Sequence, residues 1–438
     1  MAVSSESGSA TGAPPRGEYL FGKRTTMRVF SLFFLMMILD FADRMIVAAL
    51  LPLIKVEWQI SDAQAGLLSS ALFIGMVLFS VPASLAIDRW SRVKTASLMG
   101  AFWSFASGAG AFAQNIGQLA ASRAFVGVGE AGYTPAAAAW IMAAFPKRRQ
   151  QFALGSFSAG QPIGMAVGVA VGGYIASHYG WRHALGIMAI PGFVVAVFLY
   201  RARDYKNPTA IKQGQPGAVL PQTVRASLAT IFKTPTLPWI YVNSAMVVMQ
   251  MASVAYFLPT FLTRMHDVPL QTASYMTSGA VMMGIVGAPL GGWLIDLWST
   301  RYREAKIMFP LLAALVSTLL YVIAFGLTDN MGLQYACILG AVFMVTSGAS
   351  GPLAVSQELV HPGIRALSMT CNALAAHLLG SVPGPVLTGL ISDHTNLQFA
   401  LLCAAMFSGT VAVFSLYQAK RHYVKDLDTM GLPEVIPD

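Results

Sequence analysis

Long apolar stretches separated by short polar connections make up most of this chain. A helix needs about 20 apolar residues to cross the roughly 30 Å of hydrocarbon in a membrane. Twelve stretches of this kind occur, centred near residues 40, 75, 105, 130, 163, 190, 249, 283, 316, 345, 378 and 408. The sequence lacks the ten-residue alternating segments of a transmembrane barrel. The pattern predicts an all-α integral membrane protein with twelve transmembrane helices.

Composition and charge agree with that prediction. Hydrophobic residues make up 55% of the chain, charged residues only 11%, and the mean hydropathy is +0.61. Most of the 28 Lys and Arg residues fall in connections on one side, whereas Lys55, Arg182 and Arg264 fall on the other. By the positive-inside rule both termini are expected in the cytoplasm, with the protein in the inner membrane. This asymmetry accounts for the net charge of +9, so no nucleic-acid partner is predicted.

A basic connection rich in proline divides the chain into two halves. The expected parts are a disordered tail (1–25), a six-helix bundle (26–201), a cytoplasmic linker (202–235), a second six-helix bundle (236–419) and a cytoplasmic tail (420–438). Short matches recur in both halves at offsets of 207 and 208, pairing Leu50–Pro52 with Phe257–Pro259 and Ile87–Arg92 with Ile295–Thr300. A duplicated six-helix unit explains both matches.

Three charged residues interrupt the first apolar stretch. Asp40, Asp43 and Arg44 lie near its middle, where each charge costs about 2.5 to 3.5 kcal/mol on the lenient insertion scale. Charge at that depth marks a functional site, and a proton or ion pathway is the default hypothesis.

The fourth stretch carries two more charges that match the first set in depth. Arg123 and Glu130 are seven residues apart, so they lie on one helix face about 10 Å apart. Counting the rise from each membrane surface puts Asp43 level with Arg123, and Glu130 near Asp40 and Arg44. The set has one more carboxylate than guanidinium. Burial disfavours the charged form of the least paired carboxylate, which is therefore expected to load and release a proton.

The second half lacks such charges at the corresponding places. The offset of 207 carries Asp43 to Gln250, which apolar residues and methionines surround. We therefore expect the first half to bind protons and the second to contribute mainly amide and apolar contacts. The candidate substrate-binding residues are Arg44, Arg123, Gln250, Tyr256, Asn372, His377, Tyr133 and Gln161.

The connection Ser84–Lys94 resembles the G-x-x-x-D-R-x-x-R signature of the major facilitator superfamily. Asp88, Arg89 and Arg92 fit the signature, although Ser84 stands where the first glycine is expected. The resemblance implies a latch on the cytoplasmic side. Asp296 repeats the carboxylate in the second half and joins the gating candidates.

The sequence contains no feature that indicates an enzyme. Cys337, Cys371 and Cys403 fall inside apolar stretches without metal-ligand spacing. A nucleotide loop and a nucleophilic triad are also missing from the sequence. We expect no metal and no cofactor, and transport driven by a gradient.

Several stretches resemble the bacterial Spinster family of the major facilitator superfamily. They are FADRMIVAALLP, ISDAQAGLLSSA, RAFVGVGEAGYTPAAAA, GWRHAL and SGPLAVSQELVHPGIRALSMTCNAL. The resemblance implies alternating access and proton-coupled transport of lysophospholipids or sphingosine phosphate-like lipids, by a protein expected to be a monomer. It implies that Asp43 and Glu130 bind protons with Arg44 and Arg123 as partners. The alternative is the family of organic anion and proton symporters, which move sugar acids and share these charges.

Overall fold

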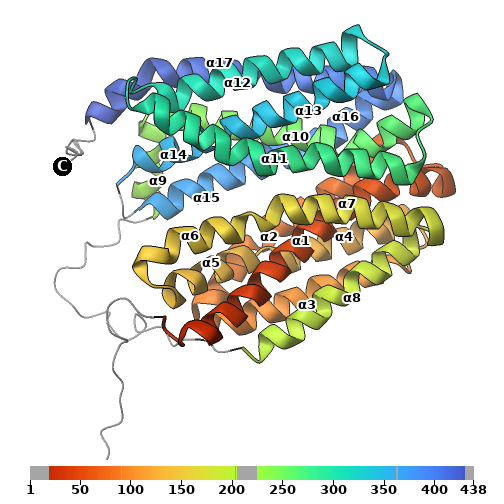
Figure 1. Ribbon diagram of the computed structural model, residues 1–438, viewed down its shortest axis with the longest axis horizontal. Coiled ribbons are helices and arrows are strands. Elements are labelled where there is room, and N and C mark those ends of the chain that lie inside the picture. The colour runs from red at the N-terminus through yellow and green to blue at the C-terminus, as the bar shows by residue number, and fades with distance from the viewer. Residues whose placement is uncertain (1–18, 90, 203, 205–223, 362–363, 430–438) are drawn as a thin grey trace, which may run out of the picture.

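The computed structural model describes residues 19–89, 91–202, 204, 224–361 and 364–429, which form helices and short connections. Most of the predicted N-terminal tail and of the predicted linker lies outside these residues. The helices form two groups, one from each half of the chain, which Figure 1 shows side by side. The predicted all-α architecture with two bundles is confirmed.

The first half runs from α1 to α8. Its helices are α1 (Lys23–Trp58), α2 (Asp62–Arg89), α3 (Arg92–Gly110), α4 (Ile116–Glu130), α5 (Tyr133–Ala144), α6 (Lys147–Ser158), α7 (Gly160–Tyr179) and α8 (Trp181–Tyr200).

The second half begins after α9 (Val224–Lys233), a short helix within the predicted linker. Its last helix continues ten residues past the boundary expected at residue 419. The elements are α10 (Thr236–His266), α11 (Leu270–Ser299), α12 (Ala305–Val322), η2 (Ile323–Leu327), α13 (Met331–Gly348), α14 (Ser350–Glu358), α15 (Arg365–Ala376), η4 (His377–Ser381), α16 (Pro383–His394) and α17 (Leu397–Thr429), where η2 and η4 are π-helical turns.

Nine helical segments in the described part of the chain are long and apolar enough to cross a membrane. Helices α1 and α4 are not among them. The first carries three charges in its middle, and the second has only 15 residues. The structure therefore shows a multi-pass membrane protein, and the count of twelve spans stays a prediction.

Four of the predicted spans are divided into consecutive helical elements. In each, a proline follows the residue between the helices by three positions, and its missing N–H cannot bond the carbonyl four residues earlier. The breaks fall at Gly132 before Pro135, Ala159 before Pro162, Ala349 before Pro352 and Val382 before Pro385.

Prolines inside corresponding helices support the duplication. Pro52 in α1 corresponds to Pro259 in α10, and Pro82 in α2 corresponds to Pro289 in α11, both at the offset of 207. The two halves therefore place prolines at corresponding positions of equivalent helices.

Glycines let α7 pack closely on the part of α1 that carries the acids. A Cβ atom at Gly164 would collide with the carbonyl of Ile38, and one at Gly168 with the carbonyl of Ala42. Small residues allow such close contact between helix backbones. The glycines thus hold α7 against the segment of α1 that contains Asp40 and Asp43.

The bundle has two ends that differ in charge. The basic end is where α1 begins at Lys23 and α17 ends at Thr429, and it lies to the left in Figure 1. The far end is where α1 ends at Trp58 and α2 begins at Asp62.

Candidate functional site

A buried ion pair joins α1 to α4 inside the first half. Arg123 Nη1 lies 3.2 Å from Asp43 Oδ2 and also donates to the Asp43 carbonyl at 3.3 Å. Ser107 on α3 completes the group, because it donates to Asp43 Oδ1 and accepts from Arg123 Nη2 at 2.9 Å. Asp43 is 4% exposed and Arg123 is 1% exposed. The depth calculation from sequence is confirmed for this pair.

A second group joins the same two helices one turn nearer the basic end. Arg44 Nη2 lies 3.0 Å from Asp40 Oδ2, and Arg44 Nε lies 3.0 Å from Glu130 Oε2. Both carboxyl groups are buried and interact with each other as well as with the guanidinium. The expected grouping of Glu130 with Asp40 and Arg44 is confirmed.

Helix geometry explains why these groups are separate. Asp40 and Arg44 are four residues apart and share a face of α1, whereas Asp43 points toward α3 and α4. Together the groups hold three carboxylates against two guanidiniums, so Asp40 and Glu130 share one cation. Such a cluster can bind a proton, and its guanidiniums can also attract an anion.

Two residues of the second half lie near the arginines. Tyr256 on α10 interacts electrostatically with Arg123, and His377 at the start of η4 interacts electrostatically with Arg44. The Tyr256 hydroxyl is buried and has no hydrogen-bond partner among the described residues. His377 stacks on Phe73 of α2 at 5.2 Å between ring centroids. Both candidates of the second half therefore lie within electrostatic range of an arginine of the first half.

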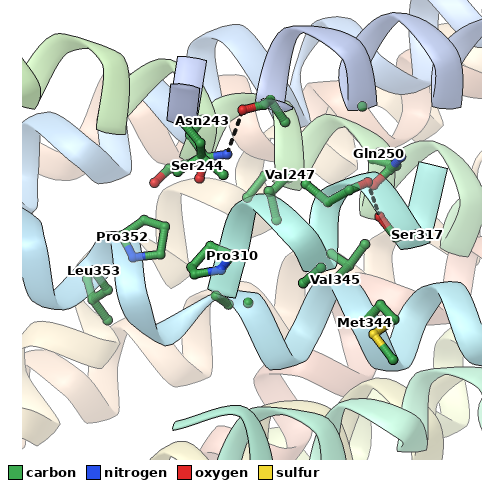
Figure 2. Close-up of a pocket in the computed structure, with 18 of the residues that line it drawn as sticks. Asn243, Ser244, Val247, Gln250, Pro310, Ser317, Met344, Val345, Pro352 and Leu353 are labelled. Carbon is green, nitrogen blue, oxygen red and sulfur yellow. Dashed lines mark hydrogen bonds between the residues drawn. The ribbon is translucent and has the colours of Figure 1, made fainter. Parts of the chain in front are cut away.

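A cavity of about 200 Å³ lies inside the second half. Figure 2 shows Asn243 and Gln250 of α10 around it, with Val247 between them. Asn372 of α15 also lines the cavity, and its Oδ1 is buried without a hydrogen-bond partner in the described part of the chain. Most of the remaining wall is apolar and includes residues of α12, α13, α14 and α17. Gln250 and Asn372 thus share one amphipathic cavity.

The remaining substrate candidates lie in different surroundings. Tyr133 is fully buried against Phe33 and Trp103, and its hydroxyl donates to the Phe33 carbonyl. Gln161 is half-buried in the first turn of α7. The structure therefore gives Tyr133 a packing role and does not place either residue in the cavity.

The gating candidates are only partly covered by the structure. The side chains of Asp88 and Arg89 lie outside the described part, although their backbone continues α2 to Arg89. The connection is shorter than Ser84–Lys94, because α3 already begins at Arg92, where Ser91 accepts from the Lys94 N–H as a cap. Asp296 is exposed near the end of α11.

Sequence reasoning missed one polar residue of these sites, Ser107, which bonds both members of the Asp43–Arg123 pair. Asn243 is a polar candidate that the sequence does indicate, because it is an amide seven residues before Gln250 on the same helix face. It lines the cavity near α17 and donates to the Ala412 carbonyl at 3.5 Å. Serines are common in apolar helices, so Ser107 gave no comparable signal. In the described residues no group of three or more His, Cys, Asp or Glu could hold a metal ion.

Comparison with known proteins agrees with this architecture. The family model of the Major Facilitator Superfamily matches residues 32–382. A probable sphingolipid transporter, spinster homolog 1 of Arabidopsis thaliana, is 27% identical over 78% of this chain and 74% of its own length. The hexuronate transporter of Bacillus subtilis strain 168 is 23% identical over 87% of this chain and 91% of its own length.

A solved structure shows the same fold. It is a bacterial homolog of the human lysosomal transporter Spinster, in an inward-facing and unoccupied conformation, with a TM-score of 0.83 and 22% identity over 92% of this chain and 99% of that one. The family match covers most of this chain, and the similar proteins include transporters of the Spinster type as well as a hexuronate transporter. The chain therefore belongs to the major facilitator superfamily of membrane transporters.

Proposed function

We propose that this protein is a proton-coupled transporter of single-chain anionic lipids, such as lysophospholipids or sphingoid phosphates, and that it works by alternating access. The observation that carries the proposal is the pairing of a buried acid and arginine cluster in one half with an amphipathic cavity in the other. The basic end faces the cytoplasm across the inner membrane, in keeping with the positive-inside rule.

The two carboxyl groups on Arg44 are the proposed proton site. Asp40 and Glu130 are buried and share one guanidinium, so full ionisation would leave one negative charge uncompensated. Two adjacent carboxyl groups in such a place hold a proton between them. Asp43, by contrast, has Arg123 and Ser107 as partners. Protonation of Asp43 would release Arg123, which makes this pair the second proposed step of coupling.

The substrate is proposed to lie between the cluster and the cavity. Arg44 is 12% exposed at its side chain, and it can attract an anionic headgroup. The cavity of about 200 Å³ is smaller than the roughly 300 to 1,000 Å³ of typical ligand sites. It therefore accommodates only part of a lipid, with Val247 and Val345 against the chain and Gln250 or Asn372 bonding a hydroxyl or amide group.

Transport of a sugar acid is the second candidate function. The named relative from Bacillus subtilis is a hexuronate transporter, and its alignment covers more of this chain than that of the Arabidopsis relative. A sugar acid would need polar partners on all its faces. The largely apolar wall of the cavity therefore favours a lipid.

Flux into proteoliposomes tests the proposal. An imposed pH gradient should drive uptake of a labelled lysophospholipid or sphingoid phosphate, and an unlabelled hexuronate should not compete. The Glu130→Gln variant should keep substrate binding and lose the response to the gradient, since an amide cannot exchange a proton. Competition by the hexuronate alone would favour the sugar-acid alternative, and gradient-driven flux through Glu130→Gln would exclude Glu130 as a proton site.

A further inference from the structure

A polar network at the far end connects the two halves. Its centre is Asp62, the first residue of α2, whose carboxylate binds Lys55 at the end of α1. From the second half, Arg264 Nη1 and Nη2 lie 2.8 and 2.9 Å from the two Asp62 oxygens. Ser392 of α16 donates to Asp62 Oδ2 at 2.6 Å. One carboxylate of the first half thus binds two helices of the second.

The second half provides a carboxylate in return. Asp393 of α16 accepts the backbone N–H groups of Asp62 at 2.6 Å and of Ala63 at 3.0 Å. These N–H groups begin α2, where a helix has unpaired donors and its dipole favours negative charge. Asp393 therefore caps a helix of the other half. We call Lys55, Asp62, Arg264, Ser392 and Asp393 the far-end clasp.

The helix backbones beneath the clasp are in direct contact. A Cβ atom at Gly389 of α16 would collide with the Asp62 carbonyl, and one at Gly66 of α2 would collide with the Pro385 carbonyl. Ser70 further along α2 donates to the Val382 carbonyl at 2.5 Å. Separation of the halves at this end would break all these contacts at once.

Burial makes the clasp stronger than an ordinary surface ion pair. The side chain of Asp62 is only 4% exposed, whereas the Arg182–Glu57 pair at the same end is about 40% exposed on both sides. Exposed pairs contribute little, whereas loss of Arg264, itself 37% exposed, would leave the buried Asp62 carboxylate with Lys55 as its remaining cation. Arg182 and Glu57 also lie within one half, so they provide a matched control.

The ion pairs that the structure describes at the basic end join residues of the same half. Lys306 binds Glu358 at 2.8 Å, and Lys420 binds Glu304 at 3.3 Å, both within the second half. These pairs can persist while the halves separate at the basic end. The far-end clasp cannot persist when the halves separate at the far end.

We infer that the far-end clasp is the gate on that side of the transporter, and that Asp62, Arg264 and Asp393 set how often the site opens there. This inference rests on the proposed alternating access and adds gating residues outside the charged cluster. A ligand or mutation shifts such an equilibrium only through its different free energy in the two states. The clasp bonds exist in one state only, so their loss favours the other.

Spin-label distances across the far end test the gate. Labels at Val56 and His394, both exposed, report the separation of the halves in a variant whose three native cysteines are replaced by alanine. Arg264→Ala should raise the ratio of the long to the short distance about tenfold or more, since it removes the two guanidinium contacts that hold the buried Asp62 carboxylate to the second half. Asp393→Asn should shift the ratio the same way by a smaller factor.

The control separates this inference from the proposed function. Arg182→Ala, at the same end but within one half, should leave the distance distribution unchanged. Unchanged distributions in both Arg264→Ala and Asp393→Asn would overturn the gate. The distances need no transported substrate, so a failed flux assay would count against the proposed function and leave this result intact. A shift in Arg182→Ala as large as that in Arg264→Ala would also reject the clasp.

Discussion

The two halves share a scaffold but carry different residues at the same helix position. Asp43 on α1 and Gln250 on α10 correspond at the offset of 207, and each is 4% exposed. Asp43 binds a guanidinium from α4 of its own half, whereas Gln250 donates to the Ala405 carbonyl of α17 at 3.3 Å. A carboxylate in this position can change its charge, and an amide cannot. The difference leaves an ionisable group at this position in the first half and a neutral amide in the second.

The surroundings of each position follow from that difference. The charged half is packed around its cluster, with glycines of α7 pressed against α1 and Ser107 inserted between Asp43 and Arg123. The second half contains a cavity next to Gln250. Leaving a buried charge without partners costs more than leaving an amide without them, so space for a ligand is easier to leave beside Gln250.

Removal of a guanidinium from the buried cluster of the first half should have the largest effect on flux and stability. Arg123→Ala leaves Asp43 buried without its cation, and we expect loss of flux together with about 3 to 5 kcal/mol of lost stability. Thermal unfolding in detergent and flux measure the two effects. Arg182→Ala is the matched control, because its exposed pair should contribute about 1 kcal/mol or less. Normal flux through Arg123→Ala would show that the cluster is not part of transport.

Substitutions at Asp43 and at Gln250 should separate proton coupling from substrate recognition. Asp43→Asn keeps the shape of the side chain, so we expect a folded protein that binds substrate and has lost proton-driven flux. Gln250→Leu should keep the pH dependence and weaken apparent affinity about two- to tenfold, the effect of one hydrogen bond. Flux measured against pH and against substrate concentration resolves both. Unaltered pH dependence in Asp43→Asn would contradict the division between the halves.

A smaller effect, on selectivity for lipid chain length, is expected from a substitution in the cavity of the second half. Val247→Trp fills part of the cavity, so it should slow transport of long-chain lysophospholipids severalfold and affect short-chain ones little. Competition among lipids of graded chain length measures this selectivity. Val286→Trp on the exposed side of α11 is the control and should change neither class. Equal slowing of all chain lengths would place the lipid chain outside the cavity.

Depth along a helix was predictable from sequence, and the contacts between the halves were not. The rise of 1.5 Å per residue sufficed to pair Asp43 with Arg123 and Glu130 with Arg44, because all four lie in one bundle with known helix directions. Pairing Asp62 with Arg264 requires the relative position of the two bundles, which the spacing of residues within each does not contain.

The helix breaks and the cavity show a similar division. Pro135 and Pro352 mark breaks whose chemistry is local and could be recognised from the sequence alone. Side chains from six helices, among them Asn372 and Pro310, form the cavity. No local sequence pattern therefore predicts it. The approach of His377 to Arg44 likewise depends on how the π-helical turn η4 meets α2.

In the proposed transport cycle, the unequal number of acids and guanidiniums in the cluster would also determine how the transporter responds to voltage. With no proton bound, the three carboxylates and two guanidiniums carry one net negative charge, whereas one bound proton makes the cluster neutral. Each charge moved through 100 mV changes the free energy by about 2.3 kcal/mol. A membrane potential that is negative inside would therefore push the empty, unprotonated site toward the outer solution, where the proposed mechanism has it take up a proton. The same potential would leave the protonated site without a directional force, so the voltage would act mainly on the step that resets the cycle.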